Sequence, residues 1–124
     1  MNRLHRIAAH LLWRPEGLLR QPVVTLSAEG AIVRIGQAES SAERDRLAGT
    51  AFYAGLLVPD FPRDYARVFA AWMAREGGCA SLAELLPQAV PAPDGCWVVI
   101  SGIDYAGLRL TPQAQIRRVE CGFS

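Results

Sequence analysis

Cysteine and histidine are the first residue types to consider in this sequence as nucleophile, base or metal ligand. Cys79 stands just before Ser81–Glu84, a capping-box pattern that predicts the start of a helix. Because a helix N-terminus stabilises a thiolate, Cys79 is the candidate nucleophile of a thiol-dependent enzyme. No histidine lies near it in the sequence, so an ordinary surface thiol is the competing interpretation. Cys96 adjoins Trp97 in an apolar run and is expected to be a buried, inert thiol.

The histidines and cysteines do not have the spacing of a metal site. His5 and His10 are five residues apart, so on a strand their side chains would point to opposite faces. Cys79, Cys96 and Cys121 are widely separated and form no finger pattern with histidine. Separated cysteines in odd number are typical of reduced thiols in a cytoplasmic protein. We therefore expect a cytoplasmic location, no bound metal, no cofactor and no catalytic residue.

A turn flanked by Gly102 and Gly107 contains the polar pair Asp104 and Tyr105. A carboxylate beside a phenol in a loop is a candidate contact for a small ligand, which gives an alternative function, a small-ligand-binding domain. Aspartate also forms turns through its own side chain, and this structural role is the simpler interpretation. The sequence has no G-x-G-x-x-G or Walker pattern, so its glycines do not predict a phosphate site.

Four aromatic side chains recur at helical spacing in the middle of the chain: Phe61, Tyr65, Phe69 and Trp72. Spacings of three or four residues predict one wide apolar face on a helix. We expect this helix to have Asp60 as its N-cap and Pro62 in its first turn, and to stop at Gly77-Gly78. The aromatic face either packs on the strands as core or forms an interface with another protein or a second copy of the chain.

Runs of β-branched and apolar residues between Pro and Gly predict strands on both sides of this helix. The expected strands cover residues 4–13, 22–27, 31–36, 50–58, 96–101, 108–111 and 115–120. A Gly turn at 28–30 should join the second and third strands into a hairpin, and Pro59 should end the fourth. Residues 37–49 are polar and should form a loop or a short exposed helix. A second short helix should start at Ser81 and be cut short by Pro87.

Size and composition fit a single globular domain, residues 1–124. Hydrophobic residues make up 51% and charged residues 20%, which argues against a disordered chain. The net charge of +1 is too small to predict a nucleic-acid or membrane-surface partner. No apolar run approaches the roughly 20 residues of a membrane span. All 13 basic residues are arginine, which a GC-rich genome would explain without a role in binding.

Short motifs near both ends of the chain follow a recognisable order. The first part has a Val-rich strand, a Gly turn with an Ile-Val-x-Ile-Gly strand, and an apolar strand that runs into Val-Pro-x-Phe: Pro22–Leu26, Gly30–Gly36 and Leu56–Phe61. The last part has an apolar strand, an Asp-containing turn and a Leu-x-Leu-Thr-Pro run: Cys96–Ser101, Asp104 and Leu108–Pro112. In this order the motifs resemble the opening and closing segments of the amidohydrolase superfamily, in particular its cytosine-deaminase and chlorohydrolase branch. The resemblance covers Ile7–Pro59 and Cys96–Val119.

The resemblance implies a composite domain that has lost a catalytic barrel. In that family the two ends form one β-sandwich and a metal-binding (β/α)8 barrel of about 200 residues or more lies between them. Here a helical insert, residues 60–90, replaces the barrel between the N-terminal strands, 1–59, and the C-terminal strands, 96–124. Tyr65 and Arg67 occupy the positions of the family's His-x-His motif, so these metal ligands are missing.

These observations predict a mainly β (α+β) fold and a non-catalytic function. The expected architecture is a small antiparallel β-sandwich formed by the N- and C-terminal segments, with one amphipathic helix and a short helical turn in the middle. The expected function is that of an interaction or oligomerisation module, the remnant of a metal-dependent hydrolase. The expected partner is a second copy of the chain, as a homodimer, or another protein.

Overall fold

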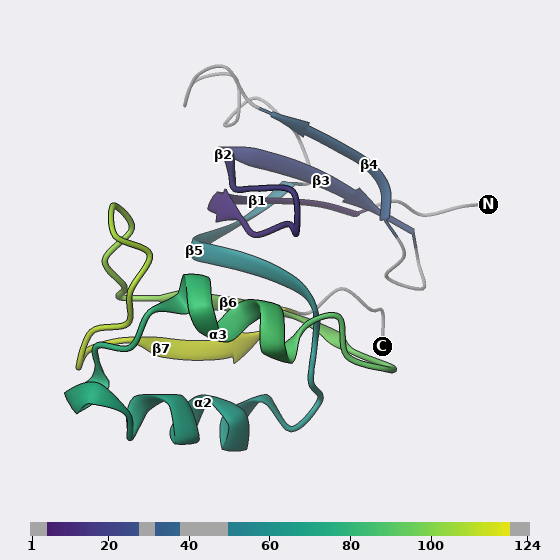
Figure 1. Ribbon diagram of the computed structural model, residues 1–124. Helices are drawn as coiled ribbons and strands as arrows, with labels where there is room; N and C mark the ends of the chain where they lie inside the picture. The colour runs from purple at the N-terminus through teal and green to yellow at the C-terminus, as the bar shows by residue number, and fades with distance from the viewer. Residues whose placement is uncertain (1–4, 28–31, 38–49, 120–124) are drawn as a thin grey trace. The chain divides into compact units, whose positions relative to one another are not determined.

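The structure is a computed structural model that describes residues 5–27, 32–37 and 50–119 (Figure 1). These residues form seven β-strands of a mixed sheet, two α-helices and one short 3-10 helix. The predicted fold class, mainly β with an α+β composition, is confirmed. No helix in the described ranges is long and apolar enough to cross a membrane.

The chain divides into two compact units. Among the described residues, the first unit ends at Leu57 and the second comprises Val58–Val119. The C-terminal strands thus belong to the same unit as the helices. The predicted turn at 28–30 and most of the predicted loop at 37–49 lie outside the described residues. That the two ends of the chain form one sandwich within a single domain stays a prediction.

The first unit is built from β1 to β4 and the part of β5 up to Leu57, and its strands pair in the order β4-β3-β1-β5. Their bounds are His5–Leu12 for β1, Leu19–Arg20 for β2, Pro22–Leu26 for β3, Ile32–Gln37 for β4 and Thr50–Phe61 for β5. β1 pairs antiparallel with β2 and β3, and β3 pairs antiparallel with β4. β1 and β5 run parallel, which is an exception to the mostly antiparallel pairing that the sequence predicted.

Alternating burial on β3 separates the two faces of this unit. Pro22, Val24 and Leu26 are buried, whereas Val23 and Thr25 are half-buried. Successive side chains on a strand point to opposite faces, so this pattern gives one fully covered face and one more open face. β1 continues the covered face with Ile7, which pairs with Val24 and is 2% exposed. β3 and β4 pair antiparallel, which confirms the two hairpin strands that the sequence predicted.

β5 continues past the residue that was expected to end it. Pro59 was predicted to stop the strand, but β5 runs to Phe61. Its pairing with β1 ends at Leu57, so Pro59, which has no N–H to donate, lies beyond that ladder. The N–H that proline lacks is not needed for pairing with β1, and the strand can continue.

The second unit contains both α-helices and two antiparallel strands. Their bounds are Tyr65–Met73 for α2, Glu76–Gly78 for the 3-10 helix η1, Leu82–Ala89 for α3, Cys96–Ser101 for β6 and Gln115–Arg118 for β7. α2 lies alongside β7 (Figure 1). The strand predicted at 108–111 was wrong, because only isolated bridges form there, from Arg109 to Ser81 and Asp104. Leu108 has a φ of +51°, which interrupts an extended chain.

The first helix begins later than the sequence suggested. Asp64, not Asp60, precedes α2, and its side chain makes no capping hydrogen bond. Pro62 disfavours a helical conformation for the preceding residue, so Phe61 stays in β5 and the predicted cap and first turn were wrong. α2 also ends at Met73, and Gly77-Gly78 belongs to η1 instead.

The second helix starts where the sequence predicted but continues past its proline. Ser81 precedes α3, yet its side chain makes no capping hydrogen bond, and so the capping box was wrong. α3 runs through Pro87 to Ala89. Pro87 has no N–H to donate to the carbonyl of Ala83, and Ala83 is an exposed residue. The next turn still closes, since the Val90 N–H donates to the Leu86 carbonyl at 3.0 Å.

Candidate functional site

The aromatic stripe predicted for the first helix belongs to the core of the second unit. Phe61, Phe69 and Trp72 are buried and Tyr65 is half-buried. The rings of Phe61 and Trp72 meet edge-on, with centroids 5.5 Å apart and an angle of 83° between the ring planes. Burial of these side chains supports the core role rather than the interface role that the sequence also allowed.

Asp104, one half of the predicted ligand pair, closes a tight turn. Its backbone N–H donates to the Arg109 carbonyl at 2.9 Å, and the Arg109 N–H donates back to the Asp104 carbonyl at 3.1 Å. Its side-chain Oδ1 accepts the Gly107 N–H at 3.2 Å. One carboxylate oxygen is therefore engaged in holding the turn, which supports the structural interpretation of this aspartate.

Tyr105, the other half of the pair, lies exposed in the same turn. Burial of part of its side chain raises the pKa of the Tyr105 phenol above its usual value of 10.0. The phenol is therefore neutral at physiological pH and would meet a ligand as a neutral hydrogen-bonding group. Asp104 and Tyr105 are adjacent in the chain, as predicted, but the hydrogen bonds of Asp104 serve the turn.

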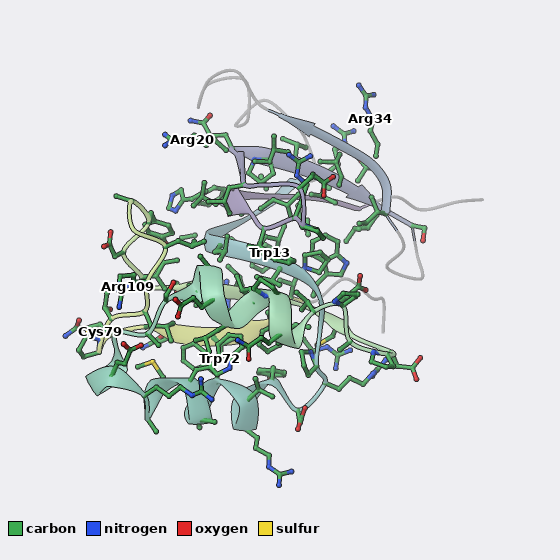
Figure 2. All side chains as sticks on the ribbon, in the orientation of Figure 1. Trp13, Arg20, Arg34, Trp72, Cys79 and Arg109 are labelled. Atoms are coloured by element: carbon green, nitrogen blue, oxygen red, sulfur yellow. The ribbon has the colours of Figure 1, made fainter. Side chains whose placement is uncertain are left out.

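The backbone of Cys79 is fastened to that turn by Arg109. Arg109 Nε donates to the Cys79 carbonyl oxygen at 3.1 Å, and Figure 2 shows the two residues at the same end of the second unit. The Cys79 side chain is exposed. The arginine holds the carbonyl and not the thiol, so this contact is structural. A thiol-dependent function for Cys79 stays a prediction.

The other residues considered for chemistry are separated in the fold. Cys96 is buried as expected, with its Sγ 3.9 Å from the Pro62 carbonyl oxygen. Tyr65 and Arg67, at the positions of the family's His-x-His motif, lie half-buried and exposed on α2. Within the described ranges, no three His, Cys, Asp or Glu side chains form a group that could hold a metal ion.

The sequence did not reveal an apolar edge on β4. Ile35 pairs with Val24 and Ile32 pairs with Leu26, and both partners are fully buried, whereas Ile35 is 36% and Ile32 47% exposed. The two isoleucines share a face because Val33 is an extra residue in the ladder, a β-bulge. The covered face of β3 thus extends onto β4, where its apolar side chains become exposed. We term Ile32 and Ile35 the isoleucine edge.

The opposite, more open face of these strands carries two arginines in one row. Arg34 of β4 pairs with Thr25 of β3, and Thr25 pairs with Arg6 of β1. Directly paired residues lie on the same face of a sheet, so both arginines flank Thr25. Both are exposed, and Arg34 extends away from its strand in Figure 2.

An aromatic pair stands in the next rows of the same face. Ala8 of β1 pairs with Val23 and with Phe52 of β5, and Phe52 is 44% exposed. The ring of exposed His10 meets the Phe52 ring edge-on, with centroids 5.2 Å apart. We term this surface the arginine face; its members are Arg6, His10, Val23, Thr25, Arg34 and Phe52.

Comparison with known proteins gives no relative for this arrangement. No protein-family model matches the chain, and no curated protein or solved structure is significantly similar to it. The resemblance to the amidohydrolase superfamily therefore rests on the sequence motifs alone.

Proposed function

We propose that this chain is a non-catalytic interaction module that forms a homodimer through the isoleucine edge. The observation that carries the proposal is the exposure of Ile32 and Ile35 beside the fully buried Val24 and Leu26. β4 pairs with β3 on one side, and no described residue pairs with its other side. A strand edge that exposes apolar side chains favours the addition of a further strand.

A second copy of β4 is the partner that fits this edge. Homodimers with two-fold symmetry use the same patch on both subunits, and two β4 strands related in this way run antiparallel. A register that places Ile32 opposite Ile35 of the partner subunit extends one apolar face across both subunits. In this register Arg34 is offset from its own counterpart, so like charges do not oppose each other. Favourable cross-strand pairs contribute roughly 0.2–1 kcal/mol each.

The absence of catalysis is part of the proposal and rests on the sequence motifs. Tyr65 and Arg67 stand where the amidohydrolase superfamily has metal-binding histidines, and residues 60–95 are too few for a barrel. On this view the chain is the remnant of a metal-dependent hydrolase that kept its β parts. The small-ligand alternative has less support, because the Asp104 carboxylate is engaged with Gly107.

Sedimentation equilibrium over a range of protein concentrations tests the homodimer. We expect the mass to rise from that of one chain to that of two as concentration increases. A mass that stays at one chain throughout the range would overturn the proposal.

A further inference from the structure

We propose that the arginine face binds single-stranded nucleic acid, with phosphates on Arg6 and Arg34 and a base against Phe52. This surface lies on the face of the strands opposite the isoleucine side chains, and the inference does not depend on the homodimer. The sequence predicted no nucleic-acid partner, but that expectation rested on the net charge of the whole chain.

The spacing of the two arginines suits a phosphate backbone. Neighbouring strands lie about 4.8 Å apart, so Arg6 and Arg34, on either side of Thr25, have Cα atoms about 10 Å apart. Long arginine side chains can converge from this distance on one phosphate or hold two successive ones. Guanidinium groups bind phosphate oxygens in a planar, bidentate manner. Thr25, which pairs with both arginines, carries a hydroxyl that is a further donor type.

Phe52 supplies the contact that a base would need. Ala8, which pairs with Phe52, is two residues along β1 from Arg6, a distance of about 6.8 Å at the rise of an antiparallel strand. Phe52 is 44% exposed, and the His10 ring meets its ring edge-on. Aromatic side chains on an open sheet face stack with unpaired bases, and such stacking tolerates any base sequence.

Positive charge is concentrated on the described strands of the first unit. Among the described residues, this unit contains four arginines and one acidic residue, Glu16. Over its full sequence the unit has seven arginines and six acidic residues, so its net charge is as small as that of the whole chain. The electrostatic feature that favours a polyanion is therefore the local pair Arg6 and Arg34, and not the net charge of the unit.

An acidic peptide is the competing partner, and Phe52 decides between the two. Carboxylates could use Arg6 and Arg34 but would gain nothing from an exposed phenyl ring beside them. A single strand uses both features, because it presents phosphates and unstacked bases at once. The arginine face should prefer a single strand to a duplex, because the bases of a duplex are already stacked on one another and are not available to stack on Phe52.

Fluorescence anisotropy of a labelled deoxythymidylate oligonucleotide of about 12 nucleotides, titrated with the full chain, tests the proposal. We expect a Kd of 10⁻⁴ M or tighter, on the order of non-specific binding at physiological salt. Two phosphate contacts on a single strand predict a slope of about −1.4 for log affinity against log salt. No binding at this concentration would overturn the proposal.

Variants separate the two contacts. Arg6→Gln combined with Arg34→Gln should weaken binding at least about tenfold and nearly abolish the salt dependence. Phe52→Leu should weaken binding at least about fivefold and leave the salt slope unchanged. The matched control, Arg117→Gln with Arg118→Gln, removes two exposed arginines of β7 and should change affinity less than about twofold.

Three results would contradict the inference. The first is an equal loss of affinity in the β7 control, which would show a non-specific charge effect. The second is unchanged affinity in Phe52→Leu. The third is competition by oligoglutamate as effective as competition by unlabelled oligonucleotide, which would assign the face to an acidic peptide. Circular dichroism verifies folding, and Arg34→Glu at the exposed edge replaces the double variant if that variant does not fold.

Discussion

The ring of Phe61, the last residue of β5, packs edge-on against the indole of Trp72 in α2, with the ring centroids 5.5 Å apart. Phe61 is fully buried and Trp72 is 7% exposed. The pair joins the end of a strand to the helix that follows it, within the second unit. An aromatic pair of this geometry adds to the free energy gained by burying both rings.

Trp72→Ala should destabilise the chain by about 3–5 kcal/mol, because it removes a large buried side chain and leaves a cavity. Urea denaturation followed by circular dichroism measures the change. Arg67→Ala, at an exposed position of the same helix, is the matched control and should shift stability by no more than about 0.5 kcal/mol. If Trp72→Ala kept the wild-type stability but altered the oligomeric state, the aromatic stripe would be an interface.

Gly95→Ala should destabilise the chain by about 1–3 kcal/mol or more, because the added methyl group has no room. A Cβ at Gly95 would lie 2.5 Å from the Asp60 carbonyl carbon, and backbone atoms cannot move aside cheaply. The same denaturation experiment measures the loss. Gly36→Ala is the control, since its Cβ would meet only the Val23 oxygen at 3.8 Å. Equal stability of the two variants would contradict the close approach of Gly95 to Asp60.

Asp104→Ala should lower stability by about 1 kcal/mol through loss of the acceptor for the Gly107 N–H. Asp104→Asn keeps a side-chain oxygen at this place and should retain most of the stability. Comparing the urea midpoints of the two variants tests this structural role. A large loss in Asp104→Asn, equal to that in Asp104→Ala, would show that the charge of the carboxylate matters and not its hydrogen bond.

Tyr105 should titrate at a pH above 10.0, because burial raises the pKa of its phenol. The folded chain then holds its proton more tightly than the unfolded chain. Stability from this group is full below the unfolded pKa and is lost as the pH rises through the folded pKa. The difference in absorbance at the phenolate band between wild type and Tyr105→Phe measures the midpoint. A midpoint at or below 10.0 would contradict the burial of the ring.

Much of the fold could be predicted because local patterns determine it. The apolar run Cys96–Ser101 became β6, whose first five residues are buried, and the alternation in Pro22–Leu26 became β3. The errors arose where distant segments decide. The parallel pairing of β1 with β5 has no local signal, and neither does the continuation of β5 through Pro59. The misplaced start of α2 was an error of another kind, because the preference of Phe61 for an extended conformation before Pro62 is a local signal that the sequence contains.

The candidate surfaces were less predictable than the fold. The isoleucine edge depends on a bulge at Val33, and without it Ile32 and Ile35 would point to opposite faces. The arginine face depends on the register that places Arg34 and Arg6 on either side of Thr25. Register follows from which strands pair, so neither surface could be derived from residue spacing within one strand.

Sedimentation equilibrium of three proteins tests the homodimer most directly. The first is the wild type, and the second carries Ile32→Glu and Ile35→Glu, which place charges on the isoleucine edge. The third carries Leu18→Glu, at a position that is 40% exposed but not on β4. Our account predicts two-chain masses for the wild type and the Leu18→Glu control, and a one-chain mass for the β4 variant, with all three folded. A wild type that stays at one chain, or a β4 variant that still dimerises, would contradict it.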